Sequence, residues 1–162
     1  MKFFSKSFIM LLLISIMLFP TKASASSDQT RDYQEIIIDG EAYRVETIIT
    51  ESLQENPGST KGVSQSKTAT KTQNYLDANN NVLWSVSITA TFTYDNVTSQ
   101  CTSCSHNASS YASSWSIKSS SSSYSGNSAT ATATATHADF LWITHDYTMS
   151  ITIYCSPTGV IS

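Results

Sequence analysis

The sequence has 162 residues, a formal net charge of −3 and a pI of about 5.5, so its charge balance argues against a nucleic-acid partner. The acidic residues are unevenly placed, because eight of the twelve lie between Asp28 and Glu55. The remainder of the chain is close to neutral and rich in serine and threonine.

Residues 1–25 are expected to be a secretory signal peptide. Lys2 and Lys6 precede the apolar run "FIMLLLISIMLF", and the small-residue exit "TKASAS" predicts cleavage after Ala25. The apolar run is too short to span a bilayer comfortably. The first cysteine is Cys101, so no lipoprotein anchor follows the leader. We therefore expect a secreted, extracellular protein whose mature chain has no transmembrane segment and the size of one domain.

Residues 26–60 form an acidic N-terminal piece. Two β-branched runs, at about residues 34–38 and 42–50, flank Asp39-Gly40, a pair that suits a tight hairpin turn. The following segment contains Pro57, Gly58 and Gly62 without apolar periodicity, which predicts a linker or long loop. The hairpin either joins the main sheet or is a pro-segment removed after export. An isolated hairpin is marginally stable, and this favours docking.

Residues 61–162 form the serine- and threonine-rich body. From Val82 to Tyr94 every even position is apolar, and every odd position after Leu83 is serine or threonine, which predicts a strand with one buried and one solvated face. The turn "DANNN" before it predicts a hairpin with residues 67–75. Strands are further expected at about residues 100–108, 113–119, 128–138 and 147–155, with the serine run 119–123 at a strand edge before a turn.

No segment has a helical period with caps, so the predicted fold is all-β, an antiparallel β-sandwich or flattened barrel. Alanine and threonine alternate strictly in "SATATATATHA". The alanines can face a core only if bulky side chains such as Trp84, Phe92 and Trp115 fill the space opposite. The other row then faces solvent as a candidate binding surface: Thr130, Thr132, Thr134 and Thr136.

The threonine row is expected to combine with those of residues 85–93 and 148–152 into one hydroxyl-lined surface. Such a surface is either a solvated face that resists aggregation or a binding face for polysaccharide. Trp142 lies in an aromatic loop, "DFLWITHD". Exposed, Trp142 would stack on a sugar ring or enter a membrane interface; buried, it would cap the sandwich.

Three cysteines in an exported chain predict one disulfide and one spare thiol. Cys101 and Cys104 would point to opposite faces of a regular strand, although a turn there would bring them together. A spare Cys104 is either buried and inert or exposed and able to form a dimer. With His106 these cysteines supply three zinc ligands where a structural site needs four, so we assign no metal. We also assign no cofactor and no catalytic residue, since neither a G-x-S-x-G nor an H-E-x-x-H motif is present.

The chain from Lys67 to Ser162 resembles a family of small secreted β-rich proteins of Gram-positive bacteria. The resemblance rests on "LWSVSITATFTYD", a cysteine after the next turn, an inward tryptophan after "YASS", "SYSGNSATATATA" and "ITIYCSPTGVIS". It implies export and a shared fold but no activity. The two recurring cysteines of the family fall at Cys101 and Cys155, which favours this disulfide; it would stabilise the chain by about 4 kcal/mol.

Two functions are compatible with these patterns. The first is a secreted, non-catalytic β-sandwich that binds a cell-envelope glycan or a protein partner. The alternative is a secreted toxin or antimicrobial protein with residues 26–60 as an acidic pro-segment, although its body lacks the cationic charge that favours attraction to anionic membranes.

Overall fold

The computed structural model describes residues 28–38, 41–54, 64–138 and 143–162. The predicted signal peptide, the Asp39-Gly40 turn and Trp142 lie outside these residues. Within the described part of the chain every regular element is a strand, which confirms the all-β prediction. The strands are β1 (Asp28–Ile38), β2 (Glu41–Gln54), β3 (Gln65–Leu76), β4 (Val82–Tyr94), β5 (Ser99–Ser110), β6 (Trp115–Ser125), β7 (Ser128–Ala138) and β8 (Thr144–Tyr154).

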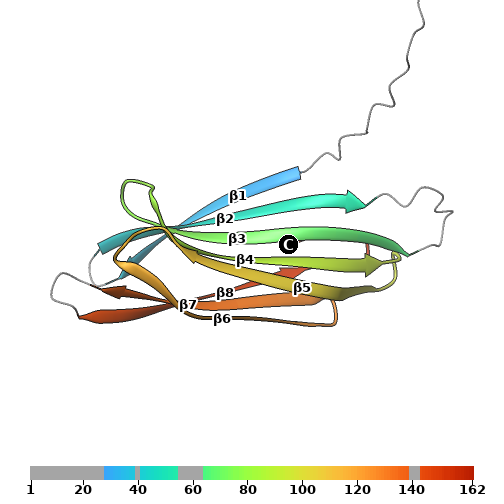
Figure 1. Cartoon of the computed structure of the whole chain (residues 1–162). Helices are drawn as coiled ribbons and strands as arrows, with labels where there is room; N and C mark the ends of the chain where they lie inside the picture. The colour runs from blue at the N-terminus through green and yellow to red at the C-terminus, as the bar shows by residue number, and fades with distance from the viewer. Residues whose placement is uncertain (1–27, 39–40, 55–63, 139–142) are drawn as a thin grey trace, which may run out of the picture.

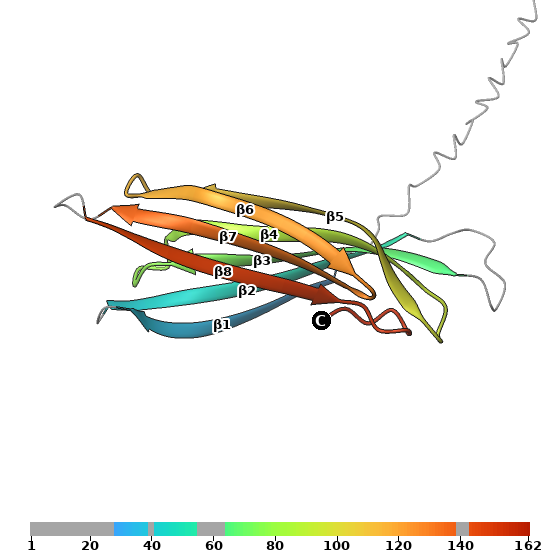
Figure 2. The same ribbon diagram turned by 90° about the horizontal axis from the view of Figure 1, so that it is seen from below.

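The eight strands form two antiparallel sheets that pack as a sandwich (Figure 1). One sheet has the order β1-β2-β3-β4-β5 and the other has the order β6-β7-β8. Within each sheet every strand pairs with its neighbours in sequence, and the chain crosses from one sheet to the other between β5 and β6. Both views show β5 and β6 running side by side (Figures 1 and 2). His106 on β5 connects them, since its ring nitrogens contact the hydroxyls of Ser122 and Ser120.

The core lies between the inner faces of the two sheets. The alternation of β4 buries its apolar residues from Trp84 to Tyr94, among them Trp84, Ile88 and Phe92. The four alanines of β7 are also buried on the facing sheet, as predicted from the alanine row: Ala129, Ala131, Ala133 and Ala135. Small side chains on one sheet leave room for large ones on the other, and this allows close packing across the sandwich.

Aromatic rings fill one end of this core. Trp115, predicted to point inward, is buried and stacks on Trp84 with ring centroids 6.3 Å apart. The ring centroids of Tyr75 and Tyr147 lie 5.3 and 5.0 Å from that of Trp115. These rings supply part of the bulk that the alanine row requires.

The N-terminal hairpin belongs to the main sheet. β2 pairs with β3 from Arg44, opposite Leu76, to Gln54, opposite Ser66. Ile36, Val45 and Ile49 are half-buried and pack against the core. The five-stranded sheet is wider than its partner, and in Figure 2 β8, an edge strand of the three-stranded sheet, runs obliquely across β2. Of the two arrangements open from the sequence, the structure has the hairpin docked.

The serine run 119–123 lies within β6, an edge strand, and the chain turns at Gly126, whose φ is +54°. β6 lacks an apolar row, but pairing with β7 fixes its register, and a bulge between Ile117 and Ser119 displaces Lys118. The C-terminus folds back on the end of β8, where the backbones of Tyr154 and Ser162 exchange two hydrogen bonds.

Candidate functional site

The predicted threonine row lies on the outer face of the three-stranded sheet. Because the alanines of β7 point into the core, the alternate side chains Thr130, Thr132, Thr134 and Thr136 point outward and are half-buried. The register aligns them with outer residues of β6 and β8. We call the resulting surface the hydroxyl face; it comprises Ser119, Ser121, Ser123, Thr130, Thr132, Thr134, Thr136, Thr148, Ser150 and Thr152.

Hydroxyl pairs run along the hydroxyl face between β7 and β8. The oxygens of Thr130 and Thr152 are 2.9 Å apart, those of Thr132 and Ser150 3.0 Å, and those of Thr134 and Thr148 2.8 Å. A hydroxyl has one donor and two acceptor sites, so each pair keeps further capacity for a ligand. Successive pairs repeat at roughly 6.8 Å, two residues along a strand. The pairs therefore form a regular ladder of hydrogen-bonding groups.

The two ends of the ladder differ. Tyr154 lies two residues beyond Thr152 on the same face and is 48% exposed, so an aromatic ring stands at one end. At the other end Thr136 donates to Asp146 at 2.7 Å, and Lys118 contacts the same carboxylate. Hydrogen bonds from Lys118 and Thr136 lower the pKa of Asp146. The sequence prediction missed Tyr154 as an aromatic anchor, although its position in the alternation of "YTMSITIYC" indicates the outer face.

The prediction of one combined hydroxyl surface was wrong. The row of residues 85–93 lies on β4 and so on the outer face of the five-stranded sheet, on the opposite side of the sandwich. There it makes its own pairs, Thr70 with Thr89 at 2.8 Å and Thr68 with Thr91 at 3.0 Å. Alternation within a strand determines which side chains face outward, but it does not indicate the sheet to which the strand belongs.

Trp142, the predicted anchor, lies outside the described residues, so its exposure stays a prediction. Besides Tyr154, three tyrosines are exposed on the described surface, and one of them, Tyr124 on β6, is 51% exposed. Tyr111 is 64% exposed, and its hydroxyl contacts that of Ser85 on the five-stranded sheet. Tyr33, on β1, is 52% exposed.

All three cysteines are thiols in the structure, so the pairing of Cys101 with Cys155 stays a prediction for the oxidised protein. The two buried residues flank one turn: the N–H of Cys101 donates to the carbonyl of Gly126 at 2.7 Å, and that of Cys155 to the carbonyl of Asn127 at 3.0 Å. Burial raises the pKa of both thiols, and Cys104 and Cys155 add smaller upward contributions at Cys101.

A β-bulge changes the expected geometry of Cys101 and Cys104. Cys104 is opposite Ala90 and Cys101 is opposite Phe92, and both β4 residues face the core. The two cysteines therefore share the inner face, because the bulge inserts Thr102 between them and resets the alternation. Cys104 is half-buried, and dimerisation through it stays a prediction.

A second candidate site lies on the outer face of the five-stranded sheet, at the corner formed by β1, β2 and the turn between β3 and β4. Two hollows flank Arg44 there, and we call them together the corner pocket. The smaller, of about 160 Å³, is lined by Glu35, Ala42, Tyr43, Arg44, Asp77 and Ala78. The larger, of about 320 Å³, is lined by Tyr33, Arg44, Glu46, Leu76, Asn80 and Val82.

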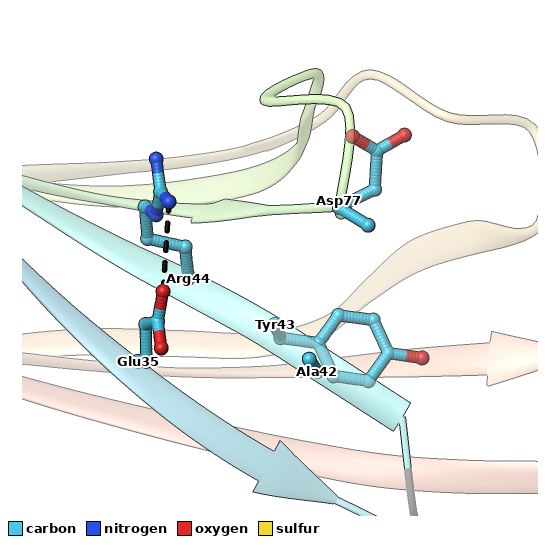
Figure 3. Close-up of a pocket in the computed structure, with 6 residues that line it drawn as sticks. Glu35, Ala42, Tyr43, Arg44 and Asp77 are labelled. Carbon is cyan, nitrogen blue, oxygen red and sulfur yellow. Dashed lines mark ion pairs between the residues drawn. The ribbon is translucent and has the colours of Figure 1, made fainter.

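Figure 3 shows how Arg44 lies in this corner. Its guanidinium points from β2 toward Glu35 on β1, and Asp77 stands on the turn opposite. The Arg44 and Glu35 side chains approach to 3.6 Å. Arg44 also donates to the Asn80 side-chain oxygen at 2.7 Å and lies 5.8 Å from the centre of the Tyr33 ring.

Among the described residues no group of three or more histidine, cysteine, aspartate and glutamate side chains is arranged to hold a metal ion. The described part of the chain also contains no helix long and apolar enough to cross a membrane. Comparisons with protein-family models, with curated proteins and with solved structures found no match.

Proposed function

We propose that this protein is a secreted, non-catalytic β-sandwich protein that binds a neutral glycan of the cell envelope through the hydroxyl face. The observation that supports the proposal is the ladder of paired hydroxyls on β7 and β8 with Tyr154 at its end. Export and the relationship to secreted proteins of Gram-positive bacteria are part of the proposal and rest on the sequence patterns.

The chemistry of the hydroxyl face suits a polymer of sugars. Side-chain hydroxyls both donate and accept, so they can match the hydroxyls of a neutral polysaccharide without requiring a charge on it. The exposed ring of Tyr154 offers a platform for the apolar face of a sugar. Each contact is weak, but several repeated contacts along one polymer add up to useful avidity.

The same face is poorly suited to covalent catalysis. A threonine hydroxyl is a weak nucleophile unless a base takes its proton. Asp146 is the carboxylate that Thr136 contacts, and its lowered pKa makes it a weak base at neutral pH. Binding is therefore the function that this geometry supports best.

Co-sedimentation with insoluble cell walls and with purified neutral polysaccharides tests the proposal. The test variants are Tyr154→Ala and the double substitution Thr132→Lys/Thr134→Lys; the matched control is Thr89→Lys/Thr91→Lys on the opposite outer face. We expect saturable binding that the test variants weaken at least tenfold and the control retains. Failure of the wild type to pellet, or equal loss in the control, would refute the proposal. Loss only in Trp142→Ala would instead place the site in the aromatic loop.

The alternative, a toxin with an acidic pro-segment, requires removal of residues 26–60. β2 pairs with β3 along most of its length, and removal would leave β3 as a bare sheet edge, which proteins generally avoid. The docked hairpin therefore favours the binding function. Intact mass of the exported protein decides between them, because a product beginning near Ser26 rules out the pro-segment.

A further inference from the structure

We propose that the corner pocket is a second saccharide site, separate from the hydroxyl face, and that it takes one neutral sugar unit. It lies on the opposite outer face of the sandwich from the hydroxyl face. The proposal does not depend on binding at the hydroxyl face.

A carboxylate in the wall of the pocket is held in a fixed position. Glu46 on β2 is only 8% exposed and accepts a hydrogen bond from Asn74 at 2.8 Å. Its other oxygen accepts from the Tyr33 hydroxyl at 2.9 Å and from Arg31 at 3.2 Å. The partners come from β1 and β3, so the pairing of three strands orients both the carboxylate and the Tyr33 ring. Such preorganisation lowers the entropic cost of binding a ligand.

The turn between β3 and β4 orients the opposite wall. The Asp77 carboxylate accepts hydrogen bonds from the backbone N–H groups of Asn79 and Asn81, both at 2.8 Å. This arrangement holds Asn80 in the left-handed region with φ of 64°, and its side-chain oxygen accepts from Arg44. The Asn80 amide and the remaining Arg44 donors therefore stand together at the rim of the larger hollow.

The contents of the pocket match a sugar. Its larger hollow, at about 320 Å³, is at the small end of ligand-binding pockets. Tyr33, Leu76 and Val82 supply apolar surface for the C–H face of the ring. Arg44, Asn80 and Glu46 supply donors and acceptors for its hydroxyls.

The local charge favours a neutral ligand. Arg31 and Arg44 are outnumbered by Glu35, Glu46 and Asp77, so the corner as a whole repels anions. An ammonium group would have to compete with the guanidinium of Arg44 for Glu35. A polyol has neither disadvantage, because it exchanges hydrogen bonds without bringing a charge.

Amide chemical-shift mapping of the isotope-labelled mature protein tests the assignment. The probes are the neutral sugars glucose, galactose and N-acetylglucosamine, with glucuronate and glucosamine as charged counterparts. We expect saturable shifts around Tyr33, Arg44, Leu76 and Asn80 with at least one neutral sugar. The affinity should fall at least tenfold in Tyr33→Leu and Arg44→Met. The matched control Tyr111→Leu, an exposed tyrosine just after β5 whose hydroxyl contacts Ser85 on the same sheet, should retain it.

Three results would overturn the assignment. They are no corner shifts with any neutral sugar at tens of millimolar, tighter binding of a charged counterpart, or equal loss in Tyr111→Leu. The amide spectrum of each variant shows whether the fold is intact. Tyr154→Ala separates the two sites, because it should weaken pelleting with polysaccharide while leaving the corner shifts unchanged.

Discussion

At the scale of single residues, the clearest energetic feature is the buried carboxylate Glu46. The hydrogen bond from Asn74 is the largest of the effects that lower its pKa, and those from Tyr33 and Arg31 add to it against the cost of burial. A carboxyl group whose pKa is lower in the folded state stabilises the fold when it is ionised. That contribution is present above the unfolded pKa of about 4.3 and is lost as the pH falls through the lower folded value.

We therefore expect the free energy of unfolding to fall on acidification below about pH 4.3, and Glu46→Gln to flatten part of that dependence. At neutral pH the variant should lose roughly 1 to 3 kcal/mol, because the charge-assisted hydrogen bonds are weakened. Urea unfolding between pH 3 and 7 measures both effects. The control is Glu35→Gln at an exposed carboxylate, which should change neither the free energy of unfolding at neutral pH nor its dependence on pH. If Glu46→Gln left the pH dependence of the unfolding free energy unchanged, the stabilising role of the ionised Glu46 would be contradicted.

Gly159 and Gly126 allow a matched comparison of backbone and packing effects. Both have positive φ, at +80° and +54°, but only at Gly159 would an added Cβ lie 2.5 Å from the Tyr94 ring. An alanine at either position costs about 1 to 2 kcal/mol for the backbone conformation. We expect Gly159→Ala to cost a further 1 to 3 kcal/mol for overpacking, measured as the difference in urea unfolding free energies. Equal losses in the two variants would show that Tyr94 moves away freely.

At the scale of elements, the N-terminal hairpin completes the larger sheet. Ile36, Val45 and Ile49 pack against the core, and Glu51 pairs with the Lys67 ammonium at 2.9 Å. A chain that begins at residue 64 should lose roughly 3 kcal/mol of stability, about 1 kcal/mol for each half-buried aliphatic side chain. It should also associate through the exposed edge of β3. Urea unfolding and sedimentation velocity measure these changes.

The control for this prediction is a protein in which the chain is cut after the hairpin but the hairpin is not removed. A protease site placed between residues 55 and 63 should give a nicked protein in which the hairpin stays paired and most of the stability is retained. If the truncated chain were monomeric and as stable as the full chain, the hairpin would not be part of the folding unit.

The elements differ in how far the sequence could predict them. From Trp84 to Tyr94, β4 alternates apolar and hydroxyl side chains, and its predicted bounds and the buried face of this stretch are confirmed; Val82 and Leu83 at its start are half-buried. β6 carries a serine run instead, so its course depends on pairing with β7. The bulge at Thr102 leaves no mark in the residue pattern, which is why Cys101 and Cys104 were expected on opposite faces.

The corner pocket could not be predicted for a related reason. Tyr33, Glu46 and Asn80 are far apart in the chain and belong to no motif. They meet only through the registers of β1 with β2 and of β2 with β3. The threonine row on β7 was predictable because it lies within one strand.

At the scale of the whole molecule, the two sheets are joined covalently by the chain between β5 and β6. A disulfide between Cys101 on β5 and Cys155 beyond β8 would add a second connection at the other end of the sequence. It would lower the entropy of the unfolded chain and stabilise the fold by about 4 kcal/mol. The raised pKa values of the buried thiols mean that few thiolates are present in the folded protein at neutral pH. Oxidation should therefore occur during folding, before the two residues are buried.

Alkylation of the denatured protein, followed by intact mass, should show one reactive thiol before reduction and three after it. Peptide mapping should show that the thiol that reacts before reduction is Cys104. Cys104→Ser should keep the stability of the oxidised wild type, whereas Cys155→Ser should lose about 4 kcal/mol. Three reactive thiols or none before reduction would contradict the pairing. A single reactive thiol at Cys155 would show that the bulge at Thr102 has directed Cys101 to Cys104 instead, leaving the two sheets joined only through the chain.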